Sequence, residues 1–322
     1  MKKIAVVFGG YSGEAEISEK SARNVLRYID RSQYNPMLVE ICNKEWKVEV
    51  DDQSVVVNKH DFSYLHHDVK ESFDAVLMMV HGSPGENGLL QGYFSMLNIP
   101  VTTGDVLNMA LTFNKYATIT QLAKLGFKVA KSFSFNSHEG INYARLGDEI
   151  GFPCFVKPNE AGSSLGISRV NSESQLESAV KKAFKVGKTV MVEAFLSGRE
   201  ISCGIIPTPN GIKAMPATEV ITENEFFDYE AKYQGKSEEI TPANITTNEM
   251  NLIQSHAKEI YLALNCHGFL RVDFMLEKGV PSIIEVNTVP GFSEKSILPQ
   301  QIQAAGIDMK DAINWALNEA LT

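Results

Sequence analysis

Two apolar segments near the C-terminal end of the chain, separated by a short turn, constrain its fold most strongly. The segments span residues 268–276 and 281–291, and Glu277, Lys278 and Gly279 lie between them. Segments joined by so short a turn pair as antiparallel strands, because parallel strands need a much longer connection. We therefore predict a β-hairpin whose side chains alternate between two faces.

One face of this hairpin carries charged and polar side chains. With the hairpin centred on Gly279, Asp273 lies opposite Glu285 and Arg271 lies opposite Asn287. The other face carries Leu270, Val272, Phe274, Ile284 and Val286. Two carboxylates this close repel each other unless a cation lies between them. Their oxygens suit Mg²⁺, which leaves positions for phosphate and water. We predict a metal site that carries phosphates, and a solvent-exposed ion pair on a half-buried hairpin is the alternative.

The size and composition are those of a globular protein with more than one unit. A chain of 322 residues exceeds one compact core, which suggests two or three units. The longest apolar runs, such as residues 73–80, are far shorter than the ~20 residues that span a bilayer. The apolar run after the basic start ends at Gly9 and Gly10, which indicates a buried strand and not a secretory signal. We expect a cytoplasmic protein.

Charge and cysteine spacing argue against several other classes of protein. A formal net charge of −9 with no basic run disfavours nucleic acid or an anionic membrane as the main partner. The four cysteines show no C-x-x-C spacing, so neither a cysteine zinc site nor a disulfide framework is predicted.

The first part of the chain, about residues 1–103, alternates predicted strands and helices. Strands at 3–9 and 73–80 each stop near glycine, and residues 88–98 have helical character. This pattern indicates an α/β unit with a parallel sheet, in which ligands bind beyond the carboxyl ends of the strands. The acidic and histidine residues at those ends are Glu14, Glu16, His81 and Glu86. Glu14 could instead simply favour a helix N-terminus.

The middle part, about residues 104–190, contains a small-residue loop at 159–168 between two predicted strands. Glycine and serine in such a loop let backbone N–H groups approach phosphate oxygens. Lys157 ends the preceding strand, and Lys115 and Lys232 offer two further cations. A polyphosphate could therefore be neutralised although no Walker A or G-x-G-x-x-G sequence occurs.

The last part, about residues 191–322, adds two acid-flanked strands and a polar loop to the hairpin. Glu193 and Glu200 flank the turn between those strands, and carboxylates at a strand edge suit adenine and ribose, which carry hydrogen-bond donors. An exposed edge strand with two acids is the alternative. The loop at 225–246 is rich in charge and tyrosine, and we predict that it forms a lid.

Motifs distributed over nearly the whole chain resemble those of the D-alanine–D-alanine ligases, a family of the ATP-grasp superfamily. In order, the motifs are FGGYSGEAEIS, HGSPGENGLLQG, FVKPNEAGSSLGIS, VEAFLSGREIS, FDYEAKY, RVDFML and IEVNTVPGFSEKSILP. The resemblance implies an α/β and α+β protein with a Rossmann-like parallel sheet in a domain at 1–103. Two ATP-grasp lobes would follow at 104–190 and 191–322, and the protein would be a homodimer.

The reaction implied by the resemblance is the ATP-dependent ligation of two D-alanine molecules for peptidoglycan precursor synthesis. ATP would phosphorylate the carboxylate of the first D-alanine, and the amine of the second would attack the acylphosphate. A tetrahedral intermediate would then lose phosphate to give D-alanyl-D-alanine. The implied partners are ATP and D-alanine, with no nucleic acid and no membrane.

The resemblance also assigns residues to ATP and metal. Lys115, Lys157 and Lys232 would hold phosphates, and Glu200 would hold the ribose. The residues that would otherwise contact the nucleotide are Ser164, Glu193, Ala194, Phe195 and Phe274. Two Mg²⁺ ions, for which Mn²⁺ could substitute, would be bound by Asp273, Glu285 and Asn287.

Substrate roles follow in the same way. Arg271 and the backbone N–H of Gly291 would stabilise the oxyanion. Glu14 would bind the ammonium of the first D-alanine and connect to Ser163 and Tyr233 in a network that closes the lid. The remaining substrate contacts would come from His81 for the first D-alanine and from Ser296 and Ile297 for the carboxylate of the second.

Two other functions share part of this pattern. A D-alanine–D-lactate ligase or another ATP-grasp carboxylate–amine ligase would keep the ATP and metal residues but alter Glu14, Tyr233 and Ser296, all of which are present. A non-catalytic nucleotide-binding module would be expected to lack Arg271 or a metal carboxylate, and this chain keeps them. The chain departs from the usual family residues at Ala15, Asn87, Asn114 and Val289.

Overall fold

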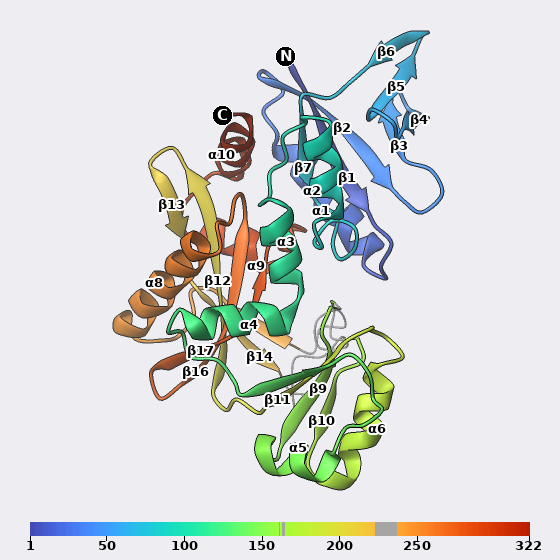
Figure 1. Ribbon diagram of the computed structural model, residues 1–322. Coiled ribbons are helices and arrows are strands. Elements are labelled where there is room, and N and C mark those ends of the chain that lie inside the picture. Colours follow the sequence, from blue (N-terminus) through green and yellow to red (C-terminus); the bar gives the residue numbers. More distant parts are fainter. Residues whose placement is uncertain (161, 163–164, 223–236) are drawn as a thin grey trace.

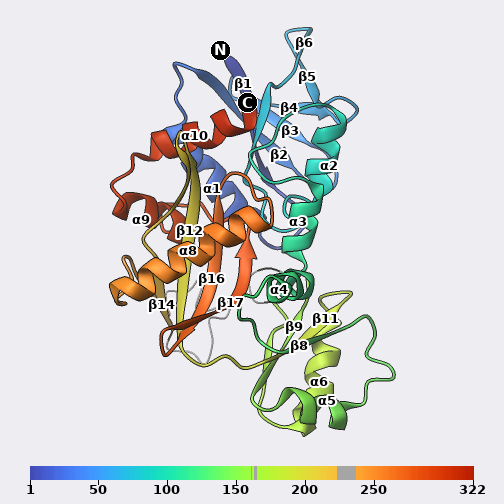
Figure 2. The same cartoon turned by 60° about the vertical axis from the view of Figure 1, so that its left-hand side comes forward.

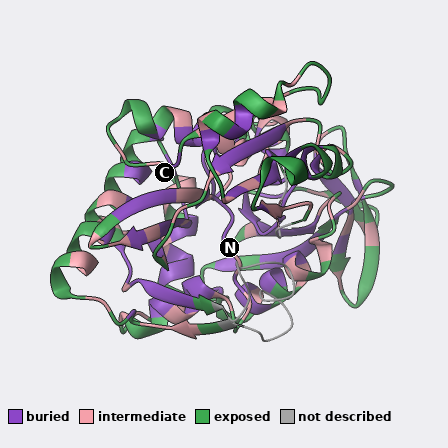
Figure 3. Cartoon of the chain, turned by 90° about the horizontal axis from the view of Figure 1, so that it is seen from below, coloured by how far each residue is buried: buried purple, intermediate pink, exposed green. Residues whose placement is uncertain are grey.

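A computed structural model shows three β-sheets, each covered by helices (Figure 1). The structure describes residues 1–160, 162, 165–222 and 237–322. The first and second sheets lie at opposite ends of the molecule and the third lies beside both (Figures 1 and 2). Buried residues follow the strands and the inner sides of the helices, and exposed residues cover the outside (Figure 3). Within these ranges, no helix has both the length and the apolar composition needed to cross a bilayer.

The first sheet has seven strands in the order β6-β5-β4-β3-β2-β1-β7. Its strands are β1 (Lys2–Gly9), β2 (Tyr34–Ile41), β3 (Lys47–Val50), β4 (Gln53–Asn58), β5 (Ser63–His66), β6 (Val69–Glu71) and β7 (Ala75–Met78). β1 pairs in parallel with β2 and β7, whereas β2 to β6 pair antiparallel. The predicted parallel sheet is therefore correct for β2, β1 and β7 only, because the two-residue turns that join β3 to β4 and β5 to β6 connect antiparallel strands.

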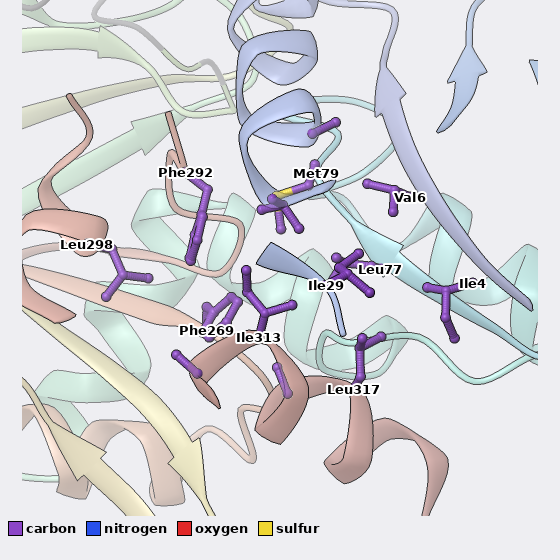
Figure 4. Close-up of a cluster of buried hydrophobic side chains, with 14 of the residues drawn as sticks. Ile4, Val6, Ile29, Leu77, Met79, Phe269, Phe292, Leu298, Ile313 and Leu317 are labelled. Atoms are coloured by element: carbon purple, nitrogen blue, oxygen red, sulfur yellow. The ribbon is translucent and has the colours of Figure 1, made fainter. Parts of the chain in front are cut away.

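Helices from both ends of the chain cover this sheet. α1 (Ala15–Tyr28) and α10 (Met309–Leu321) pack on one face, and α2 (Leu89–Met96) packs on the other. Figure 4 shows Ile4 and Val6 of β1 in the same buried cluster as Ile313 and Leu317 of α10. The last helix of the chain is thus part of the core beneath its first strand.

The second sheet is antiparallel, with the order β10-β9-β11-β8. Its elements are β8 (Ser132–Phe135), β9 (Cys154–Pro158), β10 (Ser168–Val170) and β11 (Val190–Ala194), with helices α5 (Tyr143–Ile150) and α6 (Glu173–Ala183). The helices bury Val156 and Val192 on one face. Because side chains alternate, Phe155, Lys157 and Glu193 point to the opposite face, toward the third sheet.

The third sheet has the order β15-β14-β12-β16-β17, and β13 also pairs with β12. Its strands are β12 (Arg199–Thr208), β13 (Gly211–Ala214), β14 (Thr218–Thr222), β15 (Ser237–Ile240), β16 (Leu270–Glu277) and β17 (Val280–Asn287). The accompanying helices are α3 (Val106–Phe113), α4 (Lys115–Lys124), α8 (Thr247–Ala263) and α9 (Ile297–Ala304). β15 lies inside the segment 225–246 that was predicted as a lid loop, so this part of it is a strand. Residues 225–236 of that segment lie outside the described part.

The hairpin of β16 and β17 has the predicted cross-strand pairs. Asp273 lies opposite Glu285, and Arg271 lies opposite Asn287. The four functional side chains are therefore neighbours near the start of β16 and the end of β17, away from the turn.

A β-bulge corrects the spacing of this hairpin. The turn contains only Lys278 and Gly279, and the register shifts between Asp273 and Phe274. As a result, Phe274 pairs with Ile283, which is buried in the core, whereas Ile284 lines the cleft between the sheets. The prediction that Ile284 lies on the core face was wrong, because the bulge interrupts the alternation of side chains.

Candidate active site

A cleft of about 1160 Å³ is lined by residues of all three sheets and their loops. The first sheet provides Glu14 and His81, the second provides Phe155 and Lys157, and the third provides Arg271. Pockets for a single small ligand usually measure ~300–1,000 Å³. The cleft therefore has room for a nucleotide together with smaller substrates.

Arg271 and Asp273 form a buried ion pair at one wall of the cleft. Arg271 Nε donates to Asp273 Oδ1 and Nη2 donates to Oδ2, both at 2.8 Å. Ser202 Oγ donates to Oδ1 at 2.6 Å, and Asn287 Nδ2 donates to Oδ2 at 3.0 Å. Burial alone would lower the pKa of Arg271, but the charge of Asp273 raises it, so the guanidinium remains charged. These four bonds occupy the acceptor positions of the Asp273 carboxylate.

The three predicted metal ligands are brought together but are not equally accessible. Glu285 and Asn287 line the cleft, and Lys115 Nζ lies 3.8 Å from Glu285 Oε2. Asp273 is 4% exposed and is not among the residues that line the cleft. Glu285 and Asn287 already line the cleft where a divalent cation would bind, whereas Asp273 lies behind it and would have to exchange one of its present hydrogen bonds.

A second buried ion pair lies on the wall formed by β9 and β11. Lys157 Nζ donates to Glu193 Oε2 at 2.6 Å, and the two side chains are 8% and 7% exposed. Glu193 Oε1 is buried and has no hydrogen-bond partner among the described residues. A buried acceptor without a donor is unfavourable, so this corner suits a ligand that brings an N–H or O–H group.

Aromatic side chains lie next to this acceptor. The ring of Phe195 is 6.0 Å from the ring of Phe155, and the guanidinium of Arg169 lies 5.3 Å from the Phe195 ring. Ala194 and Glu200 line the same part of the cleft. Flat aromatic faces near unsatisfied polar atoms suit a nucleobase. Phe155 was not predicted, although its alternation with Val156 placed it on the face of Lys157.

His81 is held at the opposite corner in a defined tautomer. Its Nδ1 lies 2.9 Å from the carbonyl oxygen of Val289, which only accepts, so Nδ1 carries the proton. Its Nε2 lies 3.2 Å from Ser21 Oγ. Burial lowers the pKa of His81, which favours the neutral imidazole.

Glu14 lies beside His81 and against the small-residue loop. A Cβ atom on Gly162 would lie 2.5 Å from Glu14 Oε2, so the loop approaches this carboxylate only because residue 162 is glycine. Glu86 is close by and accepts a hydrogen bond from the backbone N–H of Gly82 at 2.7 Å. Burial, and then the negative charge of Glu14, raise the pKa of Glu86 to about 8. We did not assign Glu86 to the site, although the sequence places it at a strand end.

The loop after β17 provides backbone groups to the same cleft. A Cβ atom on Gly291 would lie 2.9 Å from Ser296 Oγ, so a side chain at residue 291 would crowd that hydroxyl. Ser296 Oγ accepts a hydrogen bond from the backbone N–H of Ser293 at 3.0 Å and does not cap α9. Ser296 and Ile297 line the cleft at the start of α9, where the first backbone N–H groups of a helix suit an anion.

One predicted contact is contradicted by the structure. Phe274 is fully buried in the core of the third sheet and does not line the cleft, whereas its neighbour Met275 does. Because side chains alternate along a strand, Met275 lies on the same face as Arg271 and Asp273. The sequence therefore indicated Met275 as a cleft residue, and we did not predict it. The remaining predicted residues Ser163, Ser164, Lys232 and Tyr233 lie outside the described part of the chain.

Comparison with known proteins gives the family. The family model for the N-terminus of D-ala D-ala ligase matches residues 3–104, and the model for the C-terminus matches residues 118–318. The chain belongs to the D-alanine–D-alanine ligase family. A D-alanine–D-alanine ligase of Flavobacterium johnsoniae is 41% identical over 322 residues, with 100% of each chain covered. A relative of the same name from Christiangramia forsetii is 44% identical over 321 residues and covers 99% of this chain and 98% of its own.

Solved structures of ligases have the same fold. The VanG D-Ala:D-Ser ligase from Enterococcus faecalis is 31% identical, with a TM-score of 0.89 and 99% of each chain covered. The D-alanine–D-alanine ligase from Bacillus anthracis complexed with ATP is 26% identical, with a TM-score of 0.81 over 100% of this chain and 98% of that one. The predicted fold class, enzyme class and ligation of two D-alanine molecules are confirmed by these relatives, and ATP with a divalent metal belongs to the family.

Proposed function

We propose that the cleft between the three sheets ligates two D-alanine molecules with the residue roles that the sequence predicted, Phe274 excepted. The observation that carries this proposal is the convergence of three kinds of group in one cleft. These are the cations Lys115 and Lys157, the Arg271–Asp273 pair, and the Glu14 and His81 corner. ATP, an oxyanion and an amino-acid ammonium each require one of them.

Nucleotide binding would use the wall formed by β9 and β11, which carries the Lys157–Glu193 ion pair. Glu193 Oε1 lacks a donor among the described residues and lies beside the Phe155 and Phe195 rings, which suits the amine and the flat face of adenine. Glu200 would accept hydrogen bonds from the ribose. Lys157 and Lys115 would bind phosphate oxygens, and Met275 would replace Phe274 as an apolar contact.

Two Mg²⁺ ions, replaceable by Mn²⁺, fit the donor set at the hairpin. Glu285 and Asn287 would hold the metal, and Asp273 would join them after giving up one of its present bonds. When bound, divalent cations supply positive charge to the phosphates. Release of Asp273 from Arg271 would leave the guanidinium available to the substrate.

Substrate positioning would use the corner of the first sheet and the loop after β17. Glu14 would bind the ammonium of the first D-alanine, and neutral His81 would line that subsite. Arg271 and the Gly291 N–H would stabilise the oxyanion that forms when the second amine attacks. Ser296 and the N–H of Ile297 would hold the carboxylate of the second D-alanine.

The proposal also covers oligomeric state, location in the cell and domain boundaries. We propose a homodimer in the cytoplasm, with domain boundaries near residues 103 and 190. α10 packs on the first sheet, so the last domain also contributes to the core of the first.

The deciding experiment measures phosphate release from purified protein with ATP, Mg²⁺ and D-alanine, with the product identified by mass. L-alanine, D-alanine with D-lactate, and D-alanine with D-serine are the comparison reactions. Release with D-alanine alone and a D-alanyl-D-alanine mass supports the proposal. A mixed product formed in preference to the dipeptide would make this chain a ligase of a different second substrate.

A further inference from the structure

Two hairpin turns of the first sheet place metal-ligating side chains together, far from the cleft. β3, β4, β5 and β6 run up and down in sequence, so the turn at residues 51–52 and the turn at residues 67–68 lie at the same end of the ribbon. This end projects away from the second sheet (Figures 1 and 2). Asp51, His66 and His67 do not line the cleft.

The ligand atoms of these three residues already converge. His66 Nε2 lies 2.9 Å from Asp51 Oδ2, and His67 Nε2 lies 4.0 Å from the same oxygen. The three ligand atoms lie within 4.8 Å of one another, and no other such group of His, Cys, Asp and Glu is found in the described ranges. Ligands around a tetrahedral zinc ion are about 3.3 Å apart, since Zn–N and Zn–O bonds measure ~2.0–2.1 Å. The observed separations bracket that value.

The backbone explains how consecutive histidines reach one carboxylate. Neighbouring side chains of a strand point to opposite faces, but His67 has a φ of 49° and begins the turn. The two imidazole rings are consequently only 4.1 Å apart between centroids. Asp51 is in the same position of its own turn, with a φ of 47°.

Both turns are built from non-glycine residues at positive φ. A two-residue turn with two positive φ values normally contains Asn-Gly or Asp-Gly, and the turn of β16 and β17 ends in Gly279. Asp51 and Asp52 instead occupy the positive-φ positions of the β3–β4 turn, and His67 and Asp68 occupy those of the β5–β6 turn. Asp and His enter the left-handed region more readily than most non-glycine residues, so these turns form while presenting the side chains of Asp51 and His67.

We propose that Asp51, His66 and His67 bind a divalent transition-metal ion, with zinc as the best match. Two imidazole nitrogens and one carboxylate oxygen are a common set of three protein ligands for zinc, and water takes the fourth position. The side chains of Asp51 and His67 are 70% and 82% exposed, so the ion has direct access from solvent. The bound ion would join the β3–β4 turn to the β5–β6 turn.

The test uses the full chain without a polyhistidine tag. Zinc binding is measured by equilibrium dialysis with Mg²⁺ and a non-hydrolysable ATP analogue present in excess, so that the cleft is occupied. The variants are Asp51→Asn and His67→Asn, because asparagine tolerates the left-handed backbone and preserves each turn. The matched controls are Asp52→Asn in the first turn and His60→Asn, an exposed histidine at the opposite end of the ribbon.

We expect one zinc ion per chain in the unmodified protein and in both controls. Loss of a hydrogen-bond partner of a metal ligand weakens binding about 10–100-fold, so loss of Asp51 or His67 should weaken zinc binding by at least about 10-fold. Zinc should also raise the melting temperature of the unmodified protein and the controls more than that of the two variants. Absence of zinc binding by the unmodified protein, or equal binding by all five proteins, would overturn the proposal.

Discussion

Two ion pairs border the cleft, Arg271–Asp273 and Lys157–Glu193. They differ in how many hydrogen bonds their carboxylates receive. The Asp273 carboxylate receives four hydrogen bonds, two of them from Arg271. Glu193 has a single short contact with Lys157, and its second oxygen has no partner in the described part of the chain.

This difference indicates what each pair does. A carboxylate with all its acceptors occupied holds its neighbours in place, so the first pair orients Arg271 before any substrate arrives. A buried oxygen without a donor favours binding of a ligand that supplies one. The roles proposed above follow this difference: the Arg271–Asp273 pair (the complete pair) would serve the reacting groups, and the Lys157–Glu193 pair (the incomplete pair) would serve nucleotide recognition.

The largest expected effect comes from removing the guanidinium of the complete pair. For Arg271→Met we expect turnover to fall about 10²–10³-fold while ATP binding is retained, because an oxyanion donor is lost. Phosphate release and equilibrium ATP binding are the measurements. Arg145→Met, which removes an exposed arginine from α5, is the matched control and should keep normal turnover. Near-normal turnover of the Arg271 variant would contradict its role.

Breaking the incomplete pair should lower the stability of the protein without bound ligand. Lys157→Met leaves the Glu193 charge buried and unpaired, which we expect to lower the free energy of unfolding by about 3 kcal/mol. The double variant Lys157→Met with Glu193→Leu should recover most of that loss, because no buried charge remains. Urea unfolding of the three proteins measures both effects. A double variant as unstable as the single one would show that the ion pair itself is needed for folding.

Removing one hydrogen bond from the complete pair should have a smaller effect. Ser202 is 1% exposed and donates to Asp273, so Ser202→Ala should lower the free energy of unfolding by about 1.5 kcal/mol. The control Ser255→Ala removes an exposed hydroxyl that bonds Glu259 on α8, and we expect a change within about 0.5 kcal/mol. Equal losses in urea unfolding would mean that Ser202 does not support the pair.

The smallest expected effect is a change in pH dependence at Glu86. Its pKa in the folded protein is about 8, above the ordinary value of 4.5, so the folded state holds an extra proton between these values. Stability from this group is complete below the ordinary value and is lost as pH rises through about 8. Glu86→Gln cannot ionise, so its urea midpoint should fall less between pH 6 and pH 9. The exposed Glu16→Gln is the control, and identical curves for all three proteins would refute the shift.

Much of the site was predictable because it depends on local patterns. Alternation along two strands placed Arg271, Asp273, Glu285 and Asn287 on one face, and the bulge supplied the register in which they pair as predicted. The ordered motifs were sufficient for the family. Met275 lay within reach of the same alternation rule, so its omission was an error of reasoning and not a limit of the sequence.

Other features depended on contacts that local patterns do not contain. The bulge that turns Ile284 to the cleft and buries Ile283 depends on how the hairpin packs against its core. The meeting of Asp51 with His66 and His67 depends on the up-and-down order of four short strands, none of which was predicted.

The sequence by itself determined the family, the reaction and the types of residue at the site, because these follow from motif order and from the two-residue period of strands. Only the tertiary structure decided which carboxylates have all their hydrogen-bond partners and which lack one. The four hydrogen bonds of Asp273, and the lack of a donor for Glu193 Oε1 among the residues that the structure describes, depend on distances between strands far apart in the chain. The same holds for α10 beneath β1, since burial is a property of the packed molecule and not of any segment.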